Sequence, residues 1–162
     1  MALREELNPE YAMSLNREAL LSIIKTSSMV MRLSDRFFSQ FGTTDIQFNI
    51  LMILKNSSRE GLSQQELSER LVVTKSNVVG LIDRMEKQDL VKRNPHPTDR
   101  RFNQVVITSK GKKLLEKVEE HYYQEVNSIM TGLATSEKKS LIDASAKVRE
   151  CLKEKEEHEY KK

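Results

Sequence analysis

Apolar residues recur at steps of three and four along most of this chain, which is the spacing of helices that bury one face. Two shorter segments, 91–94 and 102–107, are predicted to form the strands of a charged hairpin. The pattern therefore predicts a mainly α-helical protein with one small β-hairpin. The expected helices cover residues 14–41, 45–55, 62–71, 74–88 and 108–131, followed by a last helix from residue 135 or 136.

Polar residues at the expected helix ends support these boundaries. Ser63 and Glu66 form an S-x-x-E capping box, and Thr44 and Gln47 fit the related T-x-x-Q pattern. In both motifs, each of the two side chains accepts a hydrogen bond from the backbone N–H of the other residue. Gly42 is expected to end the first helix in a left-handed conformation.

The helix from Thr74 has two contrasting faces. One is apolar and should pack on the preceding helices, while the other is small and polar near its N-terminal end. Such a face suits the major groove of duplex DNA, because bulky residues would hold the helix away from the base edges. The apolar face is Val78, Leu81, Ile82 and Met85; the opposite face and its flanks are Lys75, Ser76, Asn77, Val79, Gly80, Asp83, Arg84 and Lys87.

Gly80 needs an explanation, since glycine in a helix interior costs about 1 kcal/mol relative to alanine. Close approach of the helix to DNA is one reason, and close packing against another helix is the alternative. Its position on the polar face favours DNA.

Positive charge is concentrated next to this helix. Residues 84–113 hold nine Lys or Arg and three Asp or Glu, a net +6 in a chain of net charge +3. Such a concentration is expected of a phosphate-binding surface. At the hairpin turn, strand alternation places Arg100 and Arg101 on opposite sides. One of them can reach a minor groove while the other pairs with Asp99 and stiffens the loop; which arginine does which is open.

The terminal helices carry apolar seams that a monomer of this size would leave exposed, and the first helix carries two apolar stripes where a surface helix needs one. Pairing with a second copy would bury these residues and would let the protein span two DNA half-sites. The seams are Ile23, Val30, Leu33, Phe37 and Phe41; Leu20, Ile24, Met31 and Phe38; Leu114, Val118, Tyr122, Val126 and Ile129; and Leu141, Ser145, Val148 and Leu152.

Composition excludes several other classes of function. No apolar run approaches the ~20 residues needed to cross a bilayer, and the single cysteine fits a reducing compartment, so we expect no membrane partner and a cytoplasmic location. No nucleophile, phosphate-loop or dinucleotide motif occurs, and the three His and one Cys lack metal-ligand spacing. We therefore expect neither enzymatic activity nor a cofactor or metal.

The central segment resembles the MarR (multiple-antibiotic-resistance regulator) family of winged helix-turn-helix transcription factors. The family's wing signature, D-x-R followed five residues later by an aliphatic residue and Thr, appears as Asp99-Arg100-Arg101, FNQVV and Ile107-Thr108, and TSKG continues it into the next helix. The resemblance also covers the Thr44–Gln47 helix start and the block LSQQELSERLVVTKSNVVGLIDRMEKQDLVKR. It extends in order and spacing over essentially the whole chain.

This resemblance implies a homodimer that binds a pseudo-palindromic operator in double-stranded DNA, acts as a repressor, and is released by a small aromatic effector or by cysteine oxidation. Residues 43–108 would form the winged helix-turn-helix domain, and 1–42 with 109–162 the helical dimerisation region. The implied DNA-binding residues are Thr74, Lys75, Ser76, Asn77, Val79, Gly80, Arg84, Asp99, Arg100 and Arg101.

An effector pocket is expected where the first helix meets the DNA-binding domain, although residues at this spacing equally suit a plain core. Cys151 lies near the expected dimer seam, where a lone cysteine is more often a small core residue than a redox sensor. The candidate pocket residues are Met31, Phe38, Phe48, Met52 and Tyr122.

A winged-helix protein-interaction or assembly module, without specific DNA readout, is the alternative function. Such a module would more often expose aromatic or aliphatic anchors on the helix from Thr74. The small polar face beside a basic hairpin favours DNA binding instead.

Overall fold

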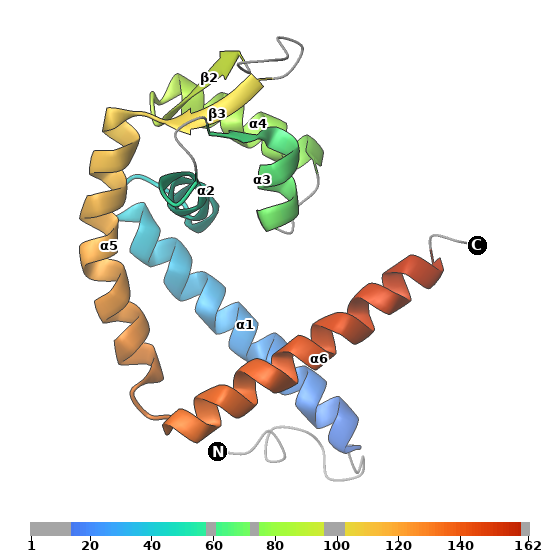
Figure 1. Ribbon diagram of the computed structural model, residues 1–162. Helices are drawn as coiled ribbons and strands as arrows, with labels where there is room; N and C mark the ends of the chain where they lie inside the picture. Colours follow the sequence, from blue (N-terminus) through green and yellow to red (C-terminus); the bar gives the residue numbers. More distant parts are fainter. Residues whose placement is uncertain (1–13, 58–60, 72–74, 96–102, 160–162) are drawn as a thin grey trace. The chain divides into compact units, whose positions relative to one another are not determined.

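The computed structural model describes residues 14–57, 61–71, 75–95 and 103–159, and within them it confirms a mainly helical fold with a small sheet (Figure 1). The chain divides into two compact units, residues 1–118 and 119–162. The elements are α1 (Leu15–Ser39), α2 (Asp45–Lys55), β1 (Leu62–Ser63), α3 (Gln64–Leu71), α4 (Lys75–Lys87), β2 (Val91–Pro95), β3 (Asn103–Ile107), α5 (Ser109–Met130) and α6 (Thr135–Glu159).

Both predicted capping boxes are present. The backbone N–H of Gln47 donates to the Thr44 hydroxyl at 3.3 Å, and that of Thr44 donates to the Gln47 side chain at 3.2 Å. Glu66 and Ser63 exchange the equivalent bonds at 3.2 and 2.8 Å. Gly42 has φ +66°, the predicted left-handed conformation after α1. These helix ends are determined by the local sequence, because each capping hydrogen bond joins residues only three positions apart.

The sheet is three-stranded and antiparallel, in the order β1-β3-β2, rather than the expected two-stranded hairpin. Leu62 belongs to strand β1, opposite Val105, and not to the helix that the sequence predicted there. A two-residue strand is too short to show any periodicity. Gly61, with φ +89°, permits this pairing, since a Cβ there would lie 2.3 Å from the Val105 carbonyl oxygen.

The core of the first unit lies between the helices and the sheet, and it contains the predicted apolar face of α4. Phe38 and Phe48 join α1 to α2, with ring centroids 5.2 Å apart. The buried apolar residues are Phe38, Phe48, Ile50, Leu51, Leu54, Leu62, Leu67, Val78, Leu81, Ile82, Met85, Leu90, Val91, Val105, Leu115 and Val118.

Most of the terminal helical surface is exposed in the single chain. Of the described residues in the two stripes predicted on α1, only Phe38 is buried in the single chain. In the second unit, none of the described side chains of α6 is buried. The large exposed apolar residues of these helices are Leu15, Leu20, Ile23, Ile24, Met29, Val30, Met31, Tyr123, Ile129, Met130, Leu141, Ile142 and Leu152.

Candidate nucleic-acid interface

Helix α4 exposes the face that the sequence assigned to DNA. Asn77 and Arg84 are exposed, Val79 is 44% exposed, and Gly80 between them is half-buried. The apolar side of the same helix is buried in the core, and this burial fixes the rotation of α4 about its axis. Of the other candidates on this element, Thr74 and the side chains of Lys75 and Ser76 lie outside the described residues.

The space around Gly80 decides between its two explanations. A Cβ built on Gly80 would have only the Arg84 guanidinium near it, with Nη1 3.7 Å away, which is ordinary van der Waals contact. Among the described residues, no neighbouring helix comes within 4 Å of that position. Close helix packing therefore does not account for this glycine.

An ion-pair cluster ties α4 to strand β2. The Arg93 guanidinium on β2 donates to Asp83 and to Glu86, with N···O distances of 2.5 Å for each. The backbone N–H of Arg93 also donates to Glu86, at 2.9 Å. Both carboxylates are on α4, so one arginine holds the helix against the strand that leads into the wing.

The Arg93 guanidinium keeps its positive charge near neutral pH. Burial acts to lower the pKa of Arg93, but the hydrogen bonds and the charges of Asp83 and Glu86 outweigh it and raise the pKa. A group whose pKa is raised on folding contributes its stabilisation at every pH below its unfolded pKa. For arginine that limit is strongly alkaline, so this cation causes no pH dependence of stability near neutrality.

The C-terminal end of α4 is held by the start of α5. Asp89 adopts a left-handed conformation, φ 58°, and the Thr108 hydroxyl donates to its carbonyl oxygen at 2.6 Å. The Lys110 ammonium donates to the Gln88 carbonyl oxygen at 2.7 Å. These bonds satisfy carbonyl groups that a helix end leaves without partners. As predicted, Thr108 also opens α5, where its hydroxyl accepts from the backbone of Gly111 at 3.0 Å.

Sequence reasoning missed the cluster around Arg93. It placed Asp83 on the open polar face of α4 and counted Arg93 among the cations available to phosphate, whereas the structure pairs them. The partners are seven and ten residues apart and lie on different elements. No rule of helical spacing connects such residues, so the only sequence signal was the presence of both charges.

The predicted tip of the wing lies outside the residues that the structure describes. Asp99, Arg100 and Arg101 lie outside the described residues. Strands β2 and β3, which lead into and out of this segment, are described and paired from Val91 opposite Ile107 to Pro95 opposite Asn103. On β2, Lys92 is exposed.

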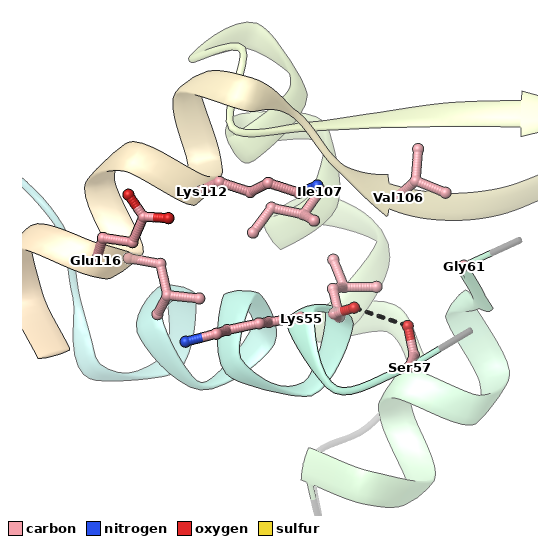
Figure 2. Close-up of a pocket in the computed structure, with 9 residues that line it drawn as sticks. Lys55, Ser57, Gly61, Val106, Ile107, Lys112 and Glu116 are labelled. Carbon is pink, nitrogen blue, oxygen red and sulfur yellow. Dashed lines mark hydrogen bonds between the residues drawn. The ribbon is translucent and has the colours of Figure 1, made fainter. Parts of the chain in front are cut away.

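The five candidates for an effector pocket occupy dissimilar places. Phe38 and Phe48 pack in the core, Met31 is 64% exposed, and Met52 and Tyr122 are half-buried. None of them lines the cavity of about 500 Å³ that the structure contains (Figure 2). That cavity is lined by Leu54, Lys55, Ser57, Gly61, Val106, Ile107, Lys112, Leu115 and Glu116.

Three further observations concern the cysteine, metal binding and membranes. Cys151 is a free, exposed thiol in this single chain and not the small core residue that its apolar neighbours suggested. Among the described residues, no three His, Cys, Asp or Glu side chains gather into a group that could hold a metal ion. None of the described helices is long and apolar enough to span a bilayer.

A helix with an exposed polar face, held against a small antiparallel sheet and preceded by a shorter helix, defines a winged-helix fold. Residues 41–101 match the family model described as the MarR family. The HTH-type transcriptional repressor YetL of Bacillus subtilis is 28% identical over 125 residues, which are 77% of this chain and 75% of YetL.

Two solved structures share the fold. A MarR family transcriptional regulator from Streptomyces coelicolor, solved in complex with DNA, has a TM-score of 0.80 at 23% identity, covering 88% of this chain and 91% of the other. CouR from Rhodococcus jostii, bound to p-coumaroyl-CoA, has a TM-score of 0.72 at 19% identity, covering 85% of this chain and 95% of CouR.

This chain is therefore similar to winged-helix transcriptional regulators of the MarR family, whose family model matches its residues 41–101. The predicted fold class is confirmed, and the relatives that the chain matches are named transcriptional regulators, in agreement with the resemblance found in the sequence.

Proposed function

We propose that this protein is a cytoplasmic, homodimeric repressor that binds a pseudo-palindromic operator and is released by a small-molecule effector. The observation that carries the DNA part is the exposed face of α4, where Asn77, Val79 and Arg84 surround an unobstructed Gly80. The Arg93 cluster holds this face in place, and a preorganised face loses less entropy on docking. YetL is named a transcriptional repressor, which supports repression rather than activation of transcription.

The exposed apolar surface of the terminal helices supports the dimer. Soluble monomers rarely expose large contiguous apolar patches, yet Leu20, Ile24 and Met31 on α1 are each at least half exposed in the single chain. Residues 1–42 and 109–162 are the proposed dimerisation region, and 43–108 the DNA-binding domain. Two copies related by a two-fold axis would present two α4 helices to successive half-sites.

DNA binding is tested by selecting bound sequences from random duplexes and then titrating salt against the best site. Affinity should fall steeply with salt, with a log–log slope of several units, because phosphate contacts release counterions. Asn77→Ala and Val79→Ala should change base preference, at about 1–3 kcal/mol per lost base contact. A flat salt response, with no sequence enriched, would favour the protein-interaction module instead.

Release by an effector is proposed on more general grounds. CouR, which shares the fold, is bound to p-coumaroyl-CoA, a thioester of an aromatic acid. A small aromatic effector at Met31, Phe38, Phe48, Met52 and Tyr122 stays the prediction from sequence, and alanine substitution at the half-buried Met52 and Tyr122 tests it without opening the core. Their effector response should weaken while operator affinity without effector is retained.

A further inference from the structure

We propose that Arg93 promotes DNA binding as a positioning residue: it holds the Asp83 carboxylate away from Lys87, so that the Lys87 ammonium stays available to a DNA phosphate. The inference rests on the proposed function of DNA binding through α4. It gives Arg93 a role separate from the stability that its ion pairs provide, and this role does not require Arg93 to touch DNA.

Asp83 carries a negative charge on the face of α4 that is assigned to DNA. The helical repeat places Asp83 on the same face as Gly80 and Lys87, and the side chains of both charged residues are exposed. A carboxylate on that face repels phosphate, and it also attracts the nearest cation of the helix. This acid therefore opposes DNA binding unless another group neutralises it.

Lys87 is the cation that helical spacing offers to Asp83. It lies four residues after Asp83, and an acid N-terminal to a base at this spacing is the favourable arrangement on a helix surface. Among the described residues, however, Lys87 forms no ion pair. The Asp83 carboxylate bonds the Arg93 guanidinium instead, at 2.5 Å. A tertiary ion pair has therefore replaced the local one.

Arg93 is held in the position from which it bonds Asp83. Strand β2 lies beside α4 (Figure 1), and the Arg93 side chain is only 19% exposed. Glu86 accepts from the Arg93 guanidinium and also from its backbone N–H, at 2.9 Å. A guanidinium fixed in this way loses less entropy for each bond it forms than a flexible ammonium does. Arg93 therefore competes well with Lys87 for the carboxylate.

The cations on the DNA-facing side of α4 are left without internal partners. Arg84 is exposed, and within the described part of the chain it forms no ion pair. Its guanidinium lies over Gly80, with Nη1 3.7 Å from the position of a Cβ on that glycine. Both carboxylates of α4 are bonded to Arg93. No carboxylate of this helix therefore competes with phosphate for Arg84 or Lys87.

The test is a double-mutant cycle on operator affinity with the full-length protein. The operator is the best sequence selected from random duplexes, and fluorescence anisotropy measures its affinity over a range of salt concentrations. The variants are Arg93→Ala, Asp83→Asn and the two combined, and urea unfolding gives the stability of each. Such a cycle separates the interaction between the two positions from the effect of either change alone.

Arg93→Ala should weaken operator binding several-fold, because Asp83 then pairs with Lys87. The log–log salt slope should fall in magnitude by about 0.9, the value for one phosphate contact. Asp83→Asn alone should change little, since Arg93 already neutralises this carboxylate. Combined with Arg93→Ala, it should restore the affinity and the slope without restoring the stability, a recovery that a merely structural role of Arg93 does not predict.

Two neighbouring charges provide matched controls. Glu86→Gln should not rescue Arg93→Ala, because no cation lies three or four residues from Glu86 in the helix. Lys92→Ala removes an exposed cation next to Arg93 on the same strand. Because alternate residues of a strand point to opposite faces, the effect of Lys92→Ala should be independent of Asp83→Asn.

Lys87→Ala tests the cation itself. It should lower the salt slope by the same amount as Arg93→Ala, and the two substitutions together should lower the slope no further. Arg93→Lys should keep the wild-type slope, because an ammonium at this position can still bond Asp83, although the planar fork is lost.

Three results would overturn the proposal. If Asp83→Asn does not restore binding to Arg93→Ala, Arg93 acts through stability alone or contacts phosphate itself. If Asp83→Asn alone weakens the operator as much as Arg93→Ala does, Asp83 contacts DNA directly. If Lys87→Ala keeps the wild-type slope, Lys87 contacts no phosphate. A wild-type protein that enriches no sequence contradicts the proposed function instead, and that failure is seen before any variant is compared.

Discussion

Replacing Gly80 by alanine should make the protein more stable and its DNA complex weaker. The added methyl group meets nothing closer than the Arg84 Nη1 at 3.7 Å, so it fits without displacing backbone. Alanine is favoured over glycine in a helix interior by about 1 kcal/mol. For a protein of this length, that corresponds to a rise in melting temperature of roughly 2–4 °C.

The effect on DNA should have the opposite sign. If Gly80 permits close approach of α4 to the duplex, the new methyl group pushes the helix outward and weakens base contacts on either side. We expect a loss of about 1–3 kcal/mol on the operator, the range of a lost base contact and equal to roughly 5- to 150-fold. Thermal unfolding at a fixed protein concentration and fluorescence anisotropy with labelled operator measure the two quantities on the same sample.

The matched control is Gly111→Ala, the same substitution in helix α5. There a Cβ would lie 2.1 Å from the Leu90 carbonyl oxygen, so the substitution forces the backbone to move. We expect destabilisation of about 1–3 kcal/mol, as for other overpacked sites. The reasoning about Gly80 would be refuted if Gly80→Ala lowered the melting temperature as Gly111→Ala does, or if it left operator affinity unchanged.

Three further predictions follow from the fold and the interface. Arg93→Ala should reduce the free energy of unfolding in urea by about 1–2 kcal/mol. The loss is small because the Asp83 and Glu86 side chains are 51% and 38% exposed. Arg93→Lys should restore only part of this stability, since a single ammonium group cannot bond both carboxylates as the planar guanidinium does. Ile24→Asp, at a residue 52% exposed in the single chain, should convert the proposed dimer to a monomer in sedimentation and weaken operator binding, whereas an unchanged mass would count against dimerisation through α1. Arg100→Ala or Arg101→Ala should weaken binding to specific and random DNA alike, and unchanged affinity in both variants would contradict the role of the wing.

Much of the fold could be predicted because its information is local. The capping boxes at Thr44 and Ser63 join residues three apart, and the left-handed Gly42 needs no distant partner. The buried face of α4 follows from the helical repeat alone, since side chains three and four apart share a face. The family resemblance adds the order of these elements.

The candidate interface was only partly predictable. The polar face of α4 was found correctly, since exposure of one face follows from burial of the other. The pairing of Arg93 with Asp83 and Glu86 was not predicted, because it joins strand β2 to helix α4 and no repeat within one element relates these residues. The cavity was not found either, because its walls join α2 to β3 and α5, which lie much later in the sequence.

The sequence by itself determined the capped ends of several helices and the buried face of α4, and its resemblance to a known family indicated the winged-helix fold. Only the tertiary structure decided that Gly80 has room for a methyl group, that Gly61 lets a third strand pair, and that Gly111 presses α5 against the end of α4. The physical reason is range: capping and periodicity act over three or four residues, whereas free volume and ion pairs depend on segments that meet only after folding.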